Sequence, residues 1–259
     1  MHQPLAYVHP QAKIAENVVI EPFVTIYKDV EIGAGTWIGP NVTIMDGARI
    51  GRNCRIFPGA VVSAIPQDLK FKGEESKVII GNNVTIRECV TVNRGTVDRH
   101  KTQIGDYCLL MAYVHIAHDC IIGKHCILGN AVNLAGHIII DDYAIISGLS
   151  AVHQFVNIGV HVMVSGGSLV RKDVPPYTKA AREPLSYSGI NSIGLRRRGY
   201  SPDKINEIQE IFRYIYLSGY NTTQALEKIE AEMAPTKERD EIISFIRKSD
   251  RGIMKGYHP

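Results

Sequence analysis

The chain has 259 residues, of which 45% are hydrophobic and 21% are charged, and its formal net charge at pH 7 is +3. This length and hydrophobic content are sufficient for a large buried core, which excludes a disordered chain. The small positive charge gives no support for nucleic-acid binding and is compatible with an anionic small ligand or an acidic protein partner. The sequence has no apolar run of about 18 residues and no amino-terminal signal peptide, so we expect no stable membrane insertion and a cytoplasmic location.

A repeat of six residues organises the chain from Val8 to Val170. Stepping by six gives 28 positions, of which 25 are Ile, Leu or Val. The exceptions, Asp68, Glu74 and Asp98, predict loop insertions at 63–79 and 97–103. Neither the helical period of 3.6 nor the strand period of 2 generates a strict six, whereas hexapeptide repeats are typical of a parallel β-helix. We therefore predict a mainly β protein, with a left-handed parallel β-helix over residues 1–190 and three hexapeptides in each coil.

The stacking of coils brings residues 18 apart into columns, with successive coils about 4.8 Å apart. This arithmetic places His118, Gly136 and Gln154 in one column and Asp119, His137 and Phe155 in the adjacent one. Residues that are distant in the sequence are thereby expected to be neighbours.

The carboxyl-terminal part of the chain has a different pattern. Pro175 and Pro176 are expected to end the repeat, and a linker is expected to follow. Ser201 before Pro202 predicts a helix start, and Asn221 and Thr236 predict two more. We expect a small α-helical domain over residues 191–259.

Four of the five cysteines lie four residues after an aliphatic position of the repeat, a slot otherwise filled by Val, Ala or Thr. They are interpreted as small fillers of the core, namely Cys54, Cys108, Cys120 and Cys126. The sequence contains no Cys-x-x-Cys pair, so neither a zinc framework nor a disulfide is expected.

Six of the ten histidines lie between residues 115 and 161, and none occupies an aliphatic position of the repeat. We therefore expect none of them in the core, and exposed turns that tolerate histidine are the simpler interpretation for His125 and His161. His118, His137 and His153 are expected to gather on one edge of the prism, which makes them a candidate site.

A metal site and a general base are the two interpretations of this histidine cluster. His115 and His118 are separated by three positions, whereas the zinc ligands of hexapeptide carbonic anhydrases are separated by five. A general base fits better, because imidazole titrates near neutrality and Asp119 could fix the tautomer of His118. We expect no metal and no cofactor.

Two further segments carry polar groups that the repeat does not require. The insertion at 63–79 contains Gln67, Asp68 and Lys70, and the stretch GINSIGLRRRGY contains Asn191 and a run of arginines, Arg196 to Arg198. Arginine forks suit phosphate, although a solvated basic turn is the alternative. A convex prism offers no deep pocket of its own, so a ligand site needs a second wall, and we expect an oligomer.

Seven stretches together resemble the family of UDP-N-acetylglucosamine acyltransferases, and they extend over nearly the whole chain. They are QDLK, HIAHDC, LAGH, AVHQF, GVHVMV, DVPPY and GLRRRG. The resemblance implies a homotrimer with active sites between adjacent prisms. It implies transfer of an (R)-3-hydroxyacyl chain from acyl carrier protein to the 3-hydroxyl of UDP-N-acetylglucosamine, the first step of lipid A biosynthesis.

The resemblance also implies roles for individual residues. His118 matches the general base, Asp119 the residue that orients it, and Gly136 the backbone N–H that stabilises the oxyanion. The substrate-binding residues that it implies are Gln67, Asp68, Lys70, His115, His137, His153 and Gln154, with Asn191, Arg197 and Arg198 for the nucleotide. Met163 and Gly166 match positions that set the acyl length, and the small Gly166 favours a long chain. Ile193 stands where many members have an acidic residue, which predicts an altered contact to the ribose or uracil.

Three alternatives remain at this point. The sister enzyme that N-acylates a later lipid A intermediate has an additional amino-terminal domain, for which a repeat beginning at Val8 leaves no room. A purely structural β-helix would need neither the polar insertion nor the histidine cluster. A metal-dependent hydratase would need bound metal.

Overall fold

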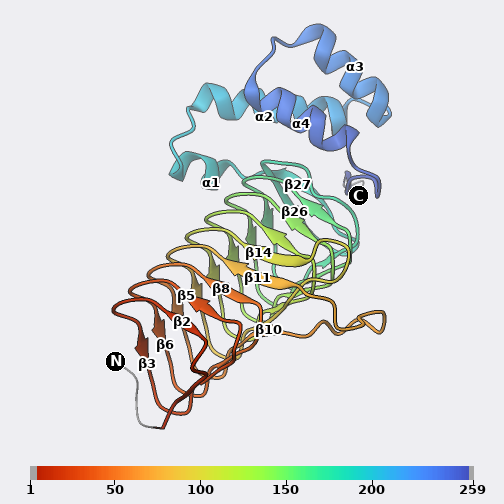
Figure 1. The fold of residues 1–259 in the computed structure, drawn as a ribbon. Helices are drawn as coiled ribbons and strands as arrows, with labels where there is room; N and C mark the ends of the chain where they lie inside the picture. The colour runs from red at the N-terminus through yellow and green to blue at the C-terminus, as the bar shows by residue number, and fades with distance from the viewer. Residues whose placement is uncertain (1–4, 257–259) are drawn as a thin grey trace.

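The computed structural model describes residues 5–256, in which short strands wind into a triangular prism with three faces (Figure 1). Each face is a sheet in which the strands of successive coils pair in parallel. The first face holds β1 (Tyr7–Val8), β4 (Thr25–Ile26), β7 (Thr43–Ile44), β10 (Val61–Ala64), β13 (Thr91–Asn93), β16 (His115–Ile116), β19 (Asn133–Leu134), β22 (Ala151–Val152) and β25 (Leu169–Val170). The second holds β2 (Lys13–Ile14), β5 (Glu31–Ile32), β8 (Ala48–Ile50), β11 (Lys77–Ile80), β14 (Lys101–Ile104), β17 (Ile121–Ile122), β20 (Ile139–Ile140) and β23 (Asn157–Ile158). The third holds β3 (Val19–Ile20), β6 (Trp37–Ile38), β9 (Arg55–Ile56), β12 (Thr85–Ile86), β15 (Leu109–Leu110), β18 (Ile127–Leu128), β21 (Ile145–Ile146), β24 (Met163–Val164), β26 (Thr178–Ala181), β27 (Ser186–Ile190) and β28 (Lys255–Gly256).

The register between coils is the 18 residues expected from the repeat. His115 pairs with Asn133, which in turn pairs with Ala151. Ladder residues such as Ile116 and Leu134 are fully buried and fill the axis of the prism. The predicted left-handed parallel β-helix is therefore confirmed.

The cysteines that follow the repeat are part of the same core. Cys54, Cys108, Cys120 and Cys126 are all buried, as expected. The Cys120 thiol donates a hydrogen bond to the carbonyl of Ala135 at 3.1 Å, and burial raises the pKa of this thiol to about 12. The burial of all four identifies them as packing groups, and at Cys120 the thiol remains protonated and is therefore a poor nucleophile.

Turns between the faces form three edges, and in most of these turns the third residue after the ladder residue adopts a left-handed conformation. Asp119 has φ = 59° and His137 has φ = 64°. This conformation is unfavourable for residues other than glycine, but bonds between coils hold it, such as the one from the His137 N–H to the His118 carbonyl at 3.1 Å. The first edge lies between the first and second faces, the second edge between the second and third, and the third edge between the third and first.

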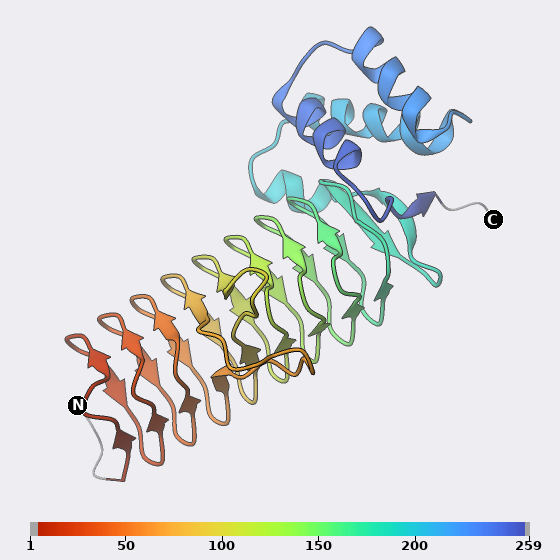
Figure 2. The same ribbon diagram turned by 45° about the vertical axis from the view of Figure 1, so that its right-hand side comes forward.

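Both insertions leave the prism at the first edge. They connect β10 to β11 (65–76) and β13 to β14 (94–100), so the second loop starts three residues earlier than predicted. The longer loop projects from the side of the coil (Figure 2). The two loops contact each other, since the Val97 N–H donates to Glu74 Oε1 at 3.1 Å.

The prediction of a linker after the two prolines is wrong, because this segment forms a β-hairpin. β26 pairs in parallel with β24, and β27 returns antiparallel to β26, so both extend the third face. The six-residue spacing ends at Val170, and a pattern search for that spacing cannot detect strands of a different length.

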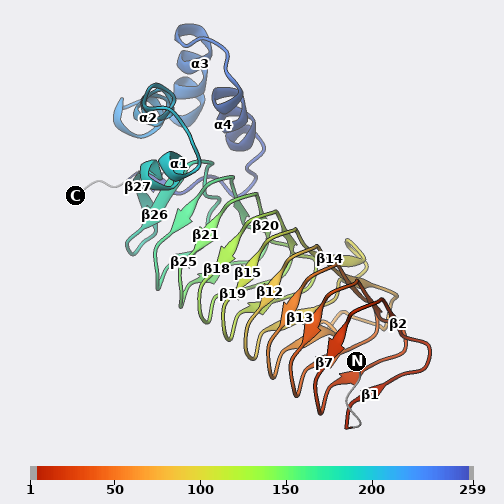
Figure 3. The same ribbon diagram turned by 90° about the vertical axis from the view of Figure 1, so that its left-hand side faces the viewer.

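Four helices cover the end of the coil: α1 (Ser192–Arg197), α2 (Pro202–Leu217), α3 (Thr222–Glu232) and α4 (Lys237–Arg247) (Figure 3). The three predicted helix starts are confirmed, since Ser201, Asn221 and Thr236 are the residues that cap α2, α3 and α4. Apolar side chains of these helices, including the buried Phe212, form a second core. Within residues 5–256, no helix is both long and apolar enough to cross a bilayer.

Candidate active site

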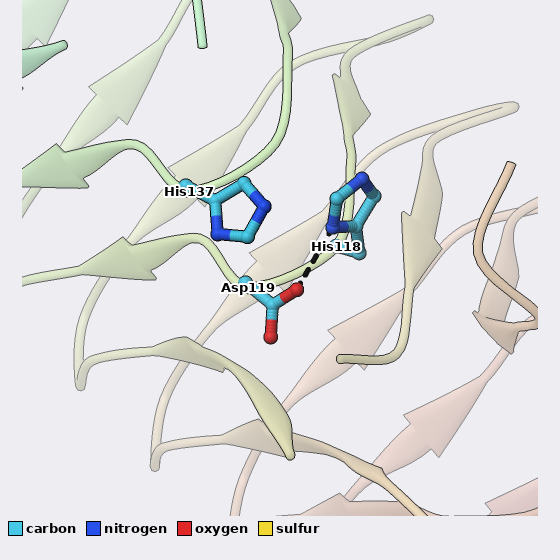
Figure 4. A group of neighbouring side chains, drawn as sticks. All are labelled: His118, Asp119 and His137. Carbon is cyan, nitrogen blue, oxygen red and sulfur yellow. Dashed lines mark hydrogen bonds and ion pairs between the residues drawn. The ribbon is translucent and has the colours of Figure 1, made fainter. Parts of the chain in front are cut away.

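His118 and Asp119 lie in the turn between β16 and β17, on the first edge. The His118 Nδ1 is 2.8 Å from Asp119 Oδ2 (Figure 4). Asp119 is completely buried, whereas 14% of the His118 side chain is exposed. The turn therefore holds the carboxylate inside and leaves the far side of the imidazole facing outward.

The loop between β13 and β14 supplies the other partners of Asp119. The Thr96 hydroxyl donates to Oδ2 at 2.6 Å, and the Thr96 and Arg99 backbone N–H groups donate at 3.1 Å. Burial alone would raise the pKa of Asp119, but the hydrogen bonds from His118, Thr96 and Arg99 outweigh it and lower the pKa to about 2. Asp119 is therefore ionised at neutral pH.

An ionised carboxylate fixes the tautomer of the imidazole. It can only accept, so the His118 Nδ1 carries the proton and donates it to Asp119. Nε2 is then an acceptor, which is the state that a general base requires. The arrangement can remove a proton from a hydroxyl placed against Nε2.

Gly136 lies one coil away, in the column of His118. A Cβ at this position would be 2.6 Å from His118 Cε1 and 2.8 Å from Nε2, so only glycine fits beside the imidazole. Within residues 5–256, the Gly136 backbone N–H donates no hydrogen bond. A free N–H beside a base is suited to a developing negative charge.

Replacement of Gly136 by alanine is expected to lower activity by roughly tenfold to a hundredfold, because the added methyl displaces the imidazole. The backbone of Gly136 is not left-handed, so the fold should remain stable. The matched control is Gly219→Ala, where φ is +74° and nothing lies within 4 Å. That variant should lose a little stability and keep its activity. Steady-state rates and thermal unfolding of both variants check this, and an active Gly136→Ala would contradict it.

His137 is in the next column, beside Asp119. Its ring meets that of His118 edge to face at 5.0 Å and stacks on Phe155 at 4.4 Å. Its Nδ1 is 3.0 Å from Asp98 Oδ2. Asp98 and Arg99 come from the same short insertion. This loop therefore holds His137 through Asp98, and it holds His118 through the bond from Arg99 to Asp119.

His118, Asp119 and His137 could geometrically also hold a metal ion, since one ligand atom of each lies within 4.8 Å of the others. However, Asp119 already accepts hydrogen bonds from Thr96 and Arg99, and the His118 imidazole that is paired with it is a donor. The geometry favours the general base over the metal.

The remaining residues of the first edge are less enclosed. His153 and Gln154 are exposed in the turn after β22. His115 lies on the first face, where its Nδ1 is 2.7 Å from the Thr91 hydroxyl, and burial lowers its pKa. Gln67, Asp68 and Lys70 lie on the longer insertion, and in the described part of the chain no hydrogen bond or ion pair joins them to His118. Asp68 Oδ1 instead accepts from the Lys70 N–H at 2.9 Å.

The residues expected to contact the nucleotide and the acyl chain lie on the other edges. Asn191 is buried at the second edge, where it caps α1 and donates to the His161 carbonyl at 2.9 Å. Arg198 lies over the Tyr143 ring at 5.3 Å, and Arg197 is exposed. Met163 and Gly166 lie on the third face and the third edge. The predicted residues are thus distributed over three edges of one prism.

His161 corrects one expectation, because it is only 6% exposed and therefore belongs to the core. It forms part of a ring stack along the second edge, at 4.9 Å from Tyr143 and 5.7 Å from Tyr177. Burial, assisted by the charge of Arg198, lowers the pKa of His161 to about 4. The turn position alone could not reveal that the helical domain covers this end of the stack.

The buried His161 predicts a loss of stability in acid. The unfolded chain binds a proton at this residue below about pH 6.5 and the folded chain only below about pH 4, so stability falls as the pH decreases between these values. Phenylalanine is accepted at the equivalent turn position 155. The melting temperature of His161→Phe should therefore decrease less between about pH 7 and pH 5 than that of the unsubstituted protein. Equal losses in the two proteins would contradict the prediction.

The fold and site together define a class. A coil of hexapeptides with a histidine and carboxylate pair on one edge is the arrangement of a hexapeptide-repeat acyltransferase. In agreement, residues 101–136 match the family described as bacterial transferase hexapeptide, and residues 2–103 match the carboxyl-terminal domain of GMPPB. Residues 173–254 match the family described as Udp N-acetylglucosamine O-acyltransferase, Domain 2.

Similar proteins extend this match to nearly the whole chain. The acyl-[acyl-carrier-protein]--UDP-N-acetylglucosamine O-acyltransferase of Aquifex aeolicus is 55% identical over 256 residues, covering 94% of this chain and 98% of the relative. The crystal structure of a UDP-N-acetylglucosamine acyltransferase from Bacteroides fragilis has a TM-score of 0.97 and 55% identity, and the match covers 98% and 100% of the two chains. The corresponding structure from Francisella novicida has a TM-score of 0.96 and 42% identity, with 98% and 94% covered. The chain belongs to the UDP-N-acetylglucosamine O-acyltransferase family.

Proposed function

We propose that this protein transfers an (R)-3-hydroxyacyl chain from acyl carrier protein to the 3-hydroxyl of UDP-N-acetylglucosamine, the first step of lipid A biosynthesis, in the cytoplasm. The substrates are those in the names of its relatives. The observation that carries the proposal is the His118 imidazole, which an ionised Asp119 leaves with an accepting Nε2 beside Gly136.

In the proposed reaction, His118 Nε2 takes the proton of the sugar 3-hydroxyl as its oxygen attacks the thioester carbonyl. The Gly136 N–H donates to the oxyanion of the tetrahedral intermediate. The intermediate collapses by breaking the C–S bond, and the imidazolium returns its proton to the departing thiolate. Asp119 remains ionised throughout and stabilises the imidazolium.

The proposed substrate contacts follow the edges of the prism. On the first edge, the sugar, diphosphate and acyl chain would contact Gln67, Asp68, Lys70, His137, His153 and Gln154, with His115 on the adjoining face. Asn191, Arg197 and Arg198 would contact the nucleotide. Because these groups lie on different edges of one chain, we propose a homotrimer in which a neighbouring copy completes each site.

The test is an acyl-transfer assay with purified protein, UDP-N-acetylglucosamine and 3-hydroxyacyl carrier proteins of several lengths. We expect O-acylated sugar nucleotide and free carrier thiol in equal amounts. In a parallel reaction with a sugar nucleotide that carries a free 2-amino group, transfer to that amine without transfer to the 3-hydroxyl of UDP-N-acetylglucosamine would favour the N-acylating sister enzyme. The absence of any transfer would reject the proposal.

The same assay tests the acyl-chain preference. Gly166 lies at the third edge and has no side chain. The space that this glycine leaves open should admit a long chain, so product mass spectrometry should show chains longer than about ten carbons. A clear preference for about ten carbons or fewer would contradict this prediction.

A further inference from the structure

The carboxyl-terminal segment returns from the helical domain to the first edge of the prism. After α4, residues 249–254 lie against Asp173. This residue is fully buried and lies in the column of Asp119 and His137. The Ser249 hydroxyl donates to Asp173 Oδ2 at 2.6 Å, and the Met254 N–H donates to the Asp173 carbonyl at 2.8 Å. Asp173 therefore fixes the position of the segment at both ends.

This attachment places Arg251 beside His153. Arg251 Nη2 is 3.2 Å from His153 Nδ1, and the Arg251 carbonyl accepts from Lys172 Nζ at 2.9 Å. A cavity of about 390 Å³ opens next to this contact, lined by Arg99, His137, Phe155, Asn157, Asp250 and Arg251. His153 lies two coils from His118, about 10 Å along the edge.

Two contacts of His153 Nδ1 differ in which ring nitrogen must carry the proton. A guanidinium only donates, so a hydrogen bond from Arg251 requires Nδ1 to be the acceptor and leaves the proton of the neutral ring on Nε2. The alternative partner of Nδ1 is the Gln154 carbonyl at 3.1 Å, which can only accept and would require the proton on Nδ1. The two contacts demand opposite tautomers, and they give Nε2 opposite hydrogen-bonding roles.

We propose that Arg251 is a positioning residue that holds His153 in the tautomer with the proton on Nε2, so that this N–H donates to an oxygen of the substrate. The C-terminal segment is then a part of the active edge as well as a part of the helical domain. The claim that His153 contacts substrate rests on the proposed function, whereas the tautomer does not.

The kinetic test compares Arg251→Met, which removes every donor, with Arg251→Lys, which keeps one. For Arg251→Met we expect kcat/KM for UDP-N-acetylglucosamine to fall about three- to tenfold through a higher KM, with kcat nearly unchanged, and Arg251→Lys should recover part of the loss. Arg247→Met is the matched control, because among residues 5–256 the side chain of Arg247 pairs only with Glu230 on the helical domain. In an His153→Ala background the Arg251→Met effect should vanish. A full effect in that background, or none in the His153 protein, would overturn the proposal.

A spectroscopic test separates this proposal from the assignment of the substrate. In protein labelled with ¹⁵N-histidine, the ring nitrogens of His153 should show Nε2 protonated and Nδ1 unprotonated, with His153→Ala identifying the signals. Arg251→Met should shift the ring toward the Nδ1-protonated form. An Nδ1-protonated ring in the unsubstituted protein would overturn the proposal even if the variants failed to fold, and the result is independent of which substrate is turned over.

Discussion

Replacement of His118 by alanine is expected to leave a folded protein whose turnover is lower by at least about a hundredfold. General base catalysis contributes about 10² to 10⁴ in rate, and no other imidazole is paired with a buried carboxylate in the part of the chain that the structure describes. Binding should change less than turnover, because the proton transfer is made only in the transition state. The measurement is kcat with saturating sugar nucleotide and carrier thioester.

His100 provides a matched control for this variant. It is exposed at the end of the short insertion, and its Nδ1 is 3.2 Å from the Glu75 carbonyl. Since φ is 53° at this residue, asparagine is the appropriate replacement, and His100→Asn should keep its activity. Unchanged turnover in His118→Ala would exclude the proposed base, and a comparable loss in both variants would indicate a general effect of removing histidine.

The coil could be predicted from the sequence because each turn of the β-helix obeys one local rule. An aliphatic residue every six positions is sufficient to assign the strands, the core and the columns, so His118 and Gly136 could be brought together by arithmetic alone. The structure confirms this neighbourhood, since a Cβ on Gly136 would lie against the His118 ring.

Contacts made by insertions could not be predicted in this way. Thr96 and Arg99 hold the Asp119 carboxylate, but they belong to a loop that has no repeat and therefore no predictable column. The one signal was Asp98 at an aliphatic position, which indicated an interruption and gave no information about its partners. Arg251 is a similar case, because its place beside His153 depends on how the helical domain folds back onto the coil.

Asp119→Asn is expected to lower turnover by at least about a hundredfold through the tautomer of His118. If the new amide group faces His118, its N–H₂ donates to Nδ1, and the imidazole proton moves to Nε2, where it blocks the base. If the amide oxygen faces His118, the N–H₂ group is directed at the donors of Thr96 and Arg99, and one of these is left unsatisfied. Neither orientation reproduces the carboxylate, so kcat should fall even where the fold is retained.

Stability provides an independent measure of the same carboxylate. The folded pKa of Asp119 is lowered to about 2 from an ordinary value of 3.8, so its stabilisation is complete above the ordinary value and is lost as the pH falls toward 2. The melting temperature of Asp119→Asn should therefore lie below that of the unsubstituted protein by a constant amount above about pH 5, and the difference should narrow in stronger acid.

Asp106→Asn is the matched control for turnover, because Asp106 lies on the second edge, where it pairs with the exposed Lys124 at 3.1 Å and its Oδ1 accepts from the Asn82 N–H at 2.8 Å. It should keep its turnover. A pair of variants in which only Asp119→Asn loses activity, and in which its stability deficit shrinks with acid, assigns the effect to an ionised carboxylate bonded to His118. A deficit that stays constant down to about pH 3 would show that this carboxylate is not held in its charged form by the loop, and the tautomer argument for the base would lose its foundation.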